Sequence, residues 1–343
     1  MIMKGGEAMH GFFQRMLTID VGTGKHHTES IDDRVLASTL GGKGLAAHLL
    51  LERNPAGVDP LGPENHLLFA LGPATDTPIW GSVRYGMFTK SPLTNAFGES
   101  YSGGKAAVPM SRTGYDVVDL KGAAEKPVWI EISDTSIQVH DAQDLWGLDA
   151  YAAEDAIKAQ VGEGAAVLVI GPAGENLVRF AVVENDYWRS AGRCGMGAVL
   201  GSKKIKGIAF HGSQKRPVAD PEGLKAKAKE ILSTYKDHKA TAAYKNFGTP
   251  MMVAMLNTAG GFPTRYWSEG TFQGWEKINA EAMNTQCEVR PRACTTCFMA
   301  CGKHLTVTHG RRQGLVVEGP EYETIYSRSE ERRVGKECVS ECR

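Results

Sequence analysis

Residues 189–210 read RSAGRCGMGAVLGSKKIKGIAF, a glycine-rich turn that runs into the short apolar segment Ile205–Phe210. The apolar segment predicts a buried strand. Successive glycines let backbone N–H groups turn toward an anion, and a helix that begins there adds its positive end. The order Gly201-Ser202-Lys203 is not that of a P-loop, and the acidic residue of a dinucleotide fingerprint is missing downstream. The stretch therefore predicts a turn, a helix and a strand, which serve either a phosphate group or tight helix–sheet packing.

The residues on either side of this stretch are rich in strand and turn signals. Glycine-bounded apolar runs, alternating patterns and N-cap residues predict these elements. The expected strands are Phe13–Val21, which ends in a turn at 22–25, and Ala166–Ile170, and a hairpin is expected over Val128–Val139. Helices are expected over Gly44–Leu51 and Ala150–Val161, and Asp149 is the expected N-cap of the second. The sequence shows no internal repeat.

A change of character follows at residues 214–217, QKRP. Asp220 then stands as an N-cap with Pro221 at the first helical position, and the chain is rich in lysine and alanine as far as Tyr244. We therefore expect an α+β protein. Its domains are a mainly β N-terminal domain over 9–217 and the beginning of a helical domain over 218–327.

The last residues, 328–343, lack any periodic pattern. From Ser329 they read SEERRVGKECVSECR, with almost no core-forming side chains. We interpret them as non-native sequence similar to sequencing-adapter readthrough, which would make Cys338 and Cys342 irrelevant. A solvated charged tail is the alternative.

Composition restricts the class of protein. Lys plus Arg and Asp plus Glu both total 39, which gives no bulk electrostatic support for nucleic-acid binding. No apolar run approaches the roughly 20 residues of a membrane helix, and the N-terminus lacks the apolar region of a signal peptide. Six of the seven cysteines follow residue 286, which fits cofactor thiols in a reducing compartment. We expect a cytoplasmic protein.

The densest chemistry is CTTCFMAC, residues 294–301, with thiols at Cys294, Cys297 and Cys301. Soft thiolates bind iron–sulfur clusters and zinc. Zinc sites usually have a second Cys or His pair a dozen or more residues away. His304 and His309 leave zinc open, and cysteines as small apolar residues on a helix remain a third interpretation. A [4Fe–4S] cluster that needs a fourth ligand fits best.

That fourth ligand has two internal candidates, Cys287 and Cys194. A ligand beyond the end of the chain is the other option.

A second glycine turn follows Arg84. Residues 84–104 read RYGMFTKSPLTNAFGESYSGG. Ser102-Gly103-Gly104 can present backbone donors, and Arg84 and Lys90 can neutralise a phosphate or pair with ring oxygens. Taken alone, this segment looks much like a surface turn.

Together, these stretches resemble the aldehyde:ferredoxin oxidoreductase family of tungsten or molybdenum pterin enzymes over residues 11–327. The resemblance rests on these segments in family order: LTIDVGTGK, GGKGLAAHLL, TKSPLT, SGG, IGPAGENLVRFA, RSAGRCGMGAVLGSKK, CTTCFMAC and EGPEYET. It implies an N-terminal β domain whose two halves straddle two pterins joined through magnesium. A [4Fe–4S] cluster lies beside the pterin in that family.

The resemblance also implies roles for individual residues. The cysteines at 294, 297 and 301 look like cluster ligands, and Arg84 looks like the arginine that bridges cluster and pterin. Tyr101, Ser102, Gly103 and Gly104 resemble the first pterin and phosphate turn; the family often has asparagine where Tyr101 stands, and there a backbone carbonyl binds magnesium.

The second turn and the metal site are implied in the same way. Arg189, Ser190 and Gly192 resemble the second pterin turn, with the Ser190 carbonyl on the magnesium. Glu323 resembles a glutamate near the metal that orients or deprotonates a water or hydrated aldehyde; otherwise it is a charge at a helix N-terminus.

The implied activity is oxidation of an aldehyde to a carboxylate at the metal, with electrons leaving singly through the cluster to ferredoxin. A homodimer or a larger complex is compatible with this. The alternatives are an iron–sulfur electron-transfer protein, a zinc-binding structural domain, and a catalytic subunit of a larger complex acting on another substrate such as an aromatic thioester. Because family members are longer, we expect a truncated chain that lacks the fourth cysteine and is inactive alone.

Overall fold

The computed structural model describes residues 9–265 and 267–329, and the chain divides after Lys225 into two compact units. The division falls inside helix α7 (Pro221–Tyr235), a few residues after the change of character noted in the sequence. Asp220 caps α7 as predicted, because its Oδ1 accepts a hydrogen bond from the Gly223 N–H at 2.8 Å. The interpretation of the C-terminal tail falls outside the described residues from position 330 onward.

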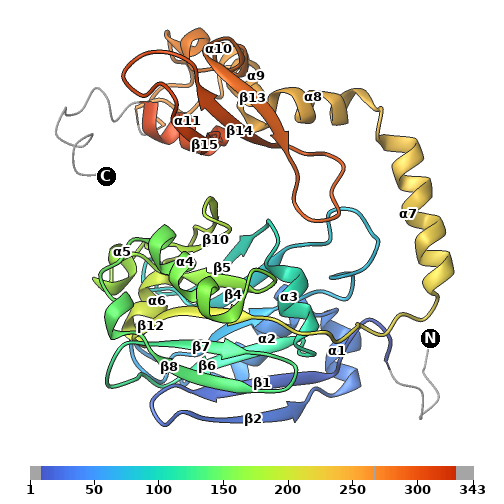
Figure 1. Cartoon of the computed structure of the whole chain (residues 1–343), viewed down its shortest axis with the longest axis vertical. Coiled ribbons are helices and arrows are strands. Elements are labelled where there is room, and N and C mark those ends of the chain that lie inside the picture. The colour runs from blue at the N-terminus through green and yellow to red at the C-terminus, as the bar shows by residue number, and fades with distance from the viewer. Residues whose placement is uncertain (1–8, 266, 330–343) are drawn as a thin grey trace. The chain divides into compact units, whose positions relative to one another are not determined.

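The first unit contains two six-stranded sheets (Figure 1). The first sheet has the order β2-β1-β6-β3-β4-β5. Its strands are β1 (Arg15–Asp20), β2 (Lys25–Ser30), β3 (Leu67–Ala70), β4 (Tyr85–Lys90), β5 (Phe97–Ser102) and β6 (Val117–Lys121). The second sheet has the order β11-β10-β9-β12-β7-β8. Its strands are β7 (Val128–Ile132), β8 (Ile137–Asp141), β9 (Ala166–Val169), β10 (Val183–Asn185), β11 (Arg189–Ala191) and β12 (Ile205–Phe210).

The two sheets repeat one topology. In each, the first and sixth strands in chain order pair in parallel, and the other neighbouring strands pair antiparallel in the same order. The helices repeat as well: α2 (Gly42–Arg53) and α4 (Ala150–Val161) follow the second strands, and α3 (Ala107–Arg112) and α6 (Met196–Ser202) follow the fifth. The expectation of no internal repeat is therefore wrong for the topology.

Alternation along the strands builds the core of this unit. Leu17, Phe69 and Met87 of the first sheet share one buried cluster with Leu168 and Phe210 of the second. The rings of Phe69 and Phe210 lie 6.0 Å apart between their centroids. Because successive side chains of a strand point to opposite faces, the intervening residues pack against helices on the outer faces. The unit is a two-sheet sandwich with helices on its outer faces.

Most of the predicted elements of this unit are present. The Val128–Val139 hairpin forms as β7 and β8, and the two predicted helices appear as α2 and α4. Asp149 caps α4 by accepting a hydrogen bond from the Ala152 N–H at 2.9 Å. The remaining short helices of the unit are α1 (Asp33–Thr39), α5 (Pro172–Glu175) and the 3₁₀ turn Gln143–Leu145.

The second unit combines helices with a small sheet that the sequence did not reveal. Three antiparallel strands form this sheet in the order β13-β14-β15. They are β13 (Cys287–Arg292), β14 (Gly302–Val307) and β15 (Val316–Glu318). The helices beyond α7 are α8 (Lys239–Phe247), α9 (Met252–Thr258), α10 (Ala280–Gln286) and α11 (Tyr322–Ser329), with 3₁₀ turns at Thr249–Met251 and Trp275–Lys277. Among the described residues, no helix is long and apolar enough to cross a membrane.

Candidate functional site

The two glycine turns of the first unit lie side by side. Ser102 ends β5 and Gly103-Gly104 follow it, and Arg189-Ser190 lies in β11, the edge strand of the other sheet. A Cβ added to Gly104 would stand 3.0 Å from Cγ of Arg189, so these two residues are in direct proximity. Gly104 also has a φ of +85°, a conformation that glycine adopts without strain. The fold therefore brings together two segments that are separated by more than 80 residues.

The topological repeat places the two turns at equivalent positions. Each lies at the end of the fifth strand of its sheet, β5 or β11. Counting back from the strand ends at Ser102 and Ala191, Tyr101 corresponds to Ser190, and Gly103 corresponds to Gly192. Tyr101, Ser190 and Gly192 are exposed. Gly103, by contrast, is buried, so the two turns differ in how open they are.

Asn185 links the two turns: it pairs with Arg189 across β10 and β11, and its side chain reaches the first turn. This side chain, only 1% exposed, ends β10 next to β11. Its Oδ1 accepts hydrogen bonds from the Ser102 hydroxyl at 2.7 Å and the Tyr85 hydroxyl at 2.9 Å. Its Nδ2 donates to the Gly103 carbonyl at 3.3 Å and to Oδ2 of Asp186 at 3.0 Å. The Asp186 oxygen also accepts from the Lys105 N–H at 2.7 Å.

Sequence reasoning did not select Asn185 or Asp186. The adjacent pair sits where two short strands turn, and asparagine and aspartate favour turns because they tolerate a left-handed backbone. That signal marks the hairpin, but it does not reveal that the pair reaches the other glycine turn.

The glycines of residues 192–201 serve two different purposes. A Cβ on Gly201 would stand 2.6 Å from the carbonyl carbon of Gly174, and one on Gly197 would stand 3.0 Å from the carbonyl group of Ala181. Both glycines are buried in α6. Around Gly192, by contrast, the nearest atom would be 3.6 Å away. The C-terminal glycines of the stretch serve tight packing, and Gly192 is the one with open space.

Arg84 lies at the same end of the first hairpin as Gly103. It precedes Tyr85, which pairs with Ser102 across β4 and β5, so Arg84 and Gly103 are the next residues beyond this pair. The Arg84 side chain is exposed. A guanidinium in this place stays charged and can offer several planar donors to a ligand.

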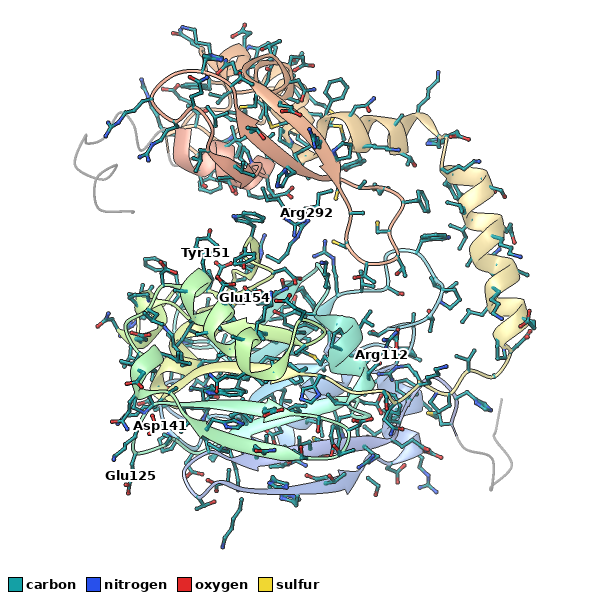
Figure 2. The ribbon with its side chains drawn as sticks, viewed as in Figure 1. Arg112, Glu125, Asp141, Tyr151, Glu154 and Arg292 are labelled. Atoms are coloured by element: carbon teal, nitrogen blue, oxygen red, sulfur yellow. The ribbon has the colours of Figure 1, made fainter. Side chains whose placement is uncertain are left out.

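A carboxyl group of unusual basicity lies behind the second turn. Burial, together with the charge of Glu154, raises the pKa of Glu184 to about 7. Glu184 pairs with Ser190 across β10 and β11. Glu154 and Tyr151 project from α4 on this side of the hairpin (Figure 2), and Oε2 of Glu154 accepts a hydrogen bond from the Tyr187 N–H at 3.0 Å. Helix α4 thus supports the loop between β10 and β11.

The three thiols of the second unit lie on one hairpin loop. Arg292 of β13 pairs with Gly302 of β14, and the loop between them carries Cys294, Cys297 and Cys301. The loop is not helical, so the helical interpretation of these cysteines is wrong. Left-handed residues, Thr296 at φ +50° and Ala300 at φ +47°, interrupt any helix here.

Lys303 supports this loop from within the unit. Its side chain is almost completely buried, at 2% exposure. The ammonium group donates to the carbonyls of Cys301 at 2.9 Å, Tyr244 at 3.0 Å, Gly302 at 3.2 Å and Ala300 at 3.3 Å. Burial lowers the pKa of Lys303, although Cys301 and Glu321 oppose this effect. The lysine fixes the backbone around the last of the three thiols.

The donor set suits a cluster better than a single zinc ion. Within the described ranges, no three His, Cys, Asp or Glu side chains converge as ligands of one metal ion. A four-iron cluster is larger than an ion, so its thiolates stand further apart, and three half-buried cysteines on one loop fit such a group. Cys287 begins β13 at the other end of the strand, roughly 17 Å from Arg292 at about 3.3 Å per residue. It therefore lies too far away to be the fourth ligand.

Glu323 lies in the first turn of α11 and is exposed. A carboxylate in the first turn stabilises a helix through its interaction with the positive end of the helix dipole.

Family comparison defines the class of protein to which these turns and thiols belong. Residues 16–212 match the N-terminal domain of aldehyde ferredoxin oxidoreductase, and residues 226–335 match its domains 2 and 3. The chain belongs to the aldehyde ferredoxin oxidoreductase family of oxidoreductases, and the resemblance drawn from its motifs is confirmed. Its α+β class, with a β-rich first part, is confirmed as well.

Particular relatives sharpen the comparison. The tungsten-containing aldehyde ferredoxin oxidoreductase of Thermococcus kodakarensis is 38% identical over 322 residues, which cover 93% of this chain and 52% of the relative. The aliphatic sulfonate oxidoreductase WOR-like subunit of Pyrococcus furiosus is 27% identical and covers 92% and 53%. Among solved structures, the active-site complex of benzoyl coenzyme A reductase with 1,5-dienoyl-CoA has a TM-score of 0.73 at 27% identity, covering 90% of this chain and 49% of that one. The chain spans about half the length of the curated relatives it matches.

Proposed function

We propose that this chain holds the pterins of a tungsten or molybdenum cofactor on its first unit and three cluster thiolates on its second. The enzyme would oxidise aldehydes to carboxylates and pass electrons to ferredoxin. One observation carries the proposal: two glycine turns, at equivalent ends of a repeated topology, meet through the buried Asn185. Two similar ligands joined to each other suit such a paired arrangement.

The backbone of the two turns would hold the cofactor. The N–H group of the exposed Gly192 would face phosphate, as glycine-rich turns do for anions, and Ser102, Gly103 and Gly104 would shape the first turn around the ligand. The exposed positions Tyr101 and Ser190 are equivalent in the repeat, and their carbonyls would bind the magnesium that joins the pterins. Arg189, beside Gly104, would add a positive charge at the phosphate.

Arg84 of the first unit and the thiol loop of the second would each have a role in electron transfer. Arg84 stands at the end of the hairpin that carries the first turn, where its charged guanidinium would pair with the pterin. Cys294, Cys297 and Cys301 would bind a [4Fe–4S] cluster on a loop whose carbonyls Lys303 holds in place. When bound, the metal–pterin group supplies the two-electron oxidation and the cluster carries single electrons.

Glu323 would act on the substrate or on the attacking water. Its carboxylate is exposed and can orient a water or a hydrated aldehyde, or accept a proton from it. In the active enzyme, removing the carboxylate would then lower turnover without changing the amount of bound cofactor.

Anaerobic expression of the full chain with tungstate tests the proposal. We expect tungsten, fluorescent pterin and iron to copurify with the chain. Arg84→Ala would weaken cofactor retention, whereas Arg34→Ala, another exposed arginine of the first unit, would not. A folded chain that carries iron without tungsten or pterin would refute the proposal in favour of an electron-transfer protein. A colourless chain that holds zinc would indicate a structural metal domain.

A second candidate concerns the substrate. The likeness to the benzoyl coenzyme A reductase active-site complex favours a catalytic subunit of a larger assembly that acts on an aromatic thioester. Ligand binding to the same purified chain separates the two: benzoyl coenzyme A would bind to it, and aldehydes would not.

A further inference from the structure

We propose that Asn185 and Asp186 are positioning residues that lock the two glycine turns at the spacing needed to hold two pterins together. The inference rests on the function proposed above. Neither residue lies in the motifs that mark the two turns. Their role would be to fix the backbone that contacts the ligand.

Asn185 uses its full hydrogen-bonding capacity in this task. A side-chain amide has two acceptor positions on its oxygen and two N–H donors. Here the oxygen accepts from Tyr85 and Ser102, and the nitrogen donates to Gly103 and Asp186. Because the amide is buried, a lost partner would leave an unsatisfied polar atom away from water. These four hydrogen bonds therefore hold the first turn in a single conformation.

Asp186 connects the loop of the second hairpin to the first turn. Oδ2 accepts from Nδ2 of Asn185 and from the N–H of Lys105, which directly follows Gly104. The second carboxylate oxygen of Asp186, Oδ1, takes part in neither of these two hydrogen bonds. An asparagine at this position can present its own oxygen to both donors, so it can reproduce the clamp without the charge.

The loop that carries Asp186 holds an unfavourable backbone conformation. Asp186 has a φ of +51° and Tyr187 a φ of +63°, and such values are uncommon for residues other than glycine. The conformation persists because Glu154 accepts the Tyr187 N–H and Asp186 accepts the Lys105 N–H. Strain held by several surrounding contacts is typical of functional sites. Here it aims the Asp186 carboxylate at the opposite turn.

The two sheets are also joined away from this clamp. The Arg193 N–H donates to the Ser100 hydroxyl at 2.9 Å, and the Ser91 hydroxyl donates to the Cys194 carbonyl at 2.9 Å. The shared apolar core lies beneath both. Loss of the Asp186 carboxylate should therefore leave the sandwich folded while the turns lose their fixed separation. A displacement of about 1 Å is enough to weaken a site built from oriented groups.

The test compares Asp186→Ala, Asp186→Asn and the wild-type full chain after anaerobic expression with tungstate. Tungsten and pterin are measured per folded chain, and the unfolding temperature is recorded for each protein. Leu36→Ala serves as the control, because Leu36 is buried in the other core cluster, and its loss lowers stability without touching the clamp.

We expect Asp186→Ala to lose about tenfold or more of its bound pterin and tungsten, an effect typical of residues that orient ligand-binding groups. Asp186→Asn and Leu36→Ala should stay within about twofold of wild type, as do changes that leave a site intact. Wild-type loading by Asp186→Ala would overturn the inference and leave the proposed function standing. Equal losses in Asp186→Asn, or losses that follow unfolding temperature in Leu36→Ala, would also overturn it. A wild-type chain without pterin would refute the proposed function, and this inference with it.

Discussion

Gly201→Ala should destabilise the first unit even though alanine is the better helix former. The new Cβ would lie 2.6 Å from the carbonyl carbon of Gly174 and 3.3 Å from the Glu175 nitrogen, against 3.4–4 Å for ordinary contacts. Overpacking of this kind costs about 1–3 kcal/mol or more, and the gain in helix propensity offsets at most about 1 kcal/mol. We expect a net loss of about 2 kcal/mol, which lowers the unfolding temperature by about 4–8 °C in a unit of this size.

Gly192→Ala is the matched control in the same stretch. Its nearest neighbour would be the Ser190 hydroxyl at 3.6 Å, so stability should change by less than about 0.5 kcal/mol. The assay is calorimetric unfolding of both variants, followed by pterin content for Gly192→Ala, which should fall if this glycine faces the ligand. If Gly201→Ala unfolds at the wild-type temperature, the assignment of the C-terminal glycines to packing is refuted.

Three further outcomes can be measured. Cys297→Ser should lose most of the bound iron and the visible absorbance. If the thiols bind zinc or are purely structural, the substitution would leave the iron content unchanged. Lys303→Met should lower the unfolding free energy of the second unit by about 3 kcal/mol in denaturant titrations, because four carbonyls lose a charged donor; the exposed Lys277→Met is its control. Because the folded-state pKa of Glu184 is raised from 4.5 to about 7, the folded protein keeps a proton that the unfolded chain releases, so stability falls as pH rises across this window. Glu184→Gln should remove about 3 kcal/mol of that pH dependence, and parallel pH profiles for both proteins would contradict the assignment.

Local signals predicted the local structure of this chain well. Asp149 and Asp220 mark helix starts through N-cap hydrogen bonds that depend on a few consecutive residues. The Val128–Val139 hairpin follows from alternation and a polar turn. The small sheet around the thiols was not predicted, because β13 contains Pro291 and charged residues and its outer strand β15 has only three residues.

Contacts between distant segments account for what the sequence could not reveal. The motifs identified both glycine turns, but the meeting of Ser102 with Asn185 depends on how the edge strands of two sheets approach each other. Nothing within either segment encodes that approach. Likewise, the glycines at 192, 197 and 201 look alike in sequence, and only their neighbours separate open space from close packing.

The repeated topology also explains why the two turns can carry such different side chains. Tyr101 and Ser190 occupy equivalent strand positions, yet one is a large aromatic residue and the other a small hydroxyl. The Tyr101 ring packs edge-on against Phe88 at 5.7 Å, and its hydroxyl donates to Glu99 at 3.0 Å. The Tyr101 side chain is thus occupied by its own hairpin, and what the two positions have in common is their place one residue before the end of the fifth strand. A site that contacts its ligand through backbone carbonyl and N–H groups depends on strand geometry and not on side-chain identity. The side chains at equivalent positions can therefore differ, and this is why the repeat is visible in the topology but not in the sequence.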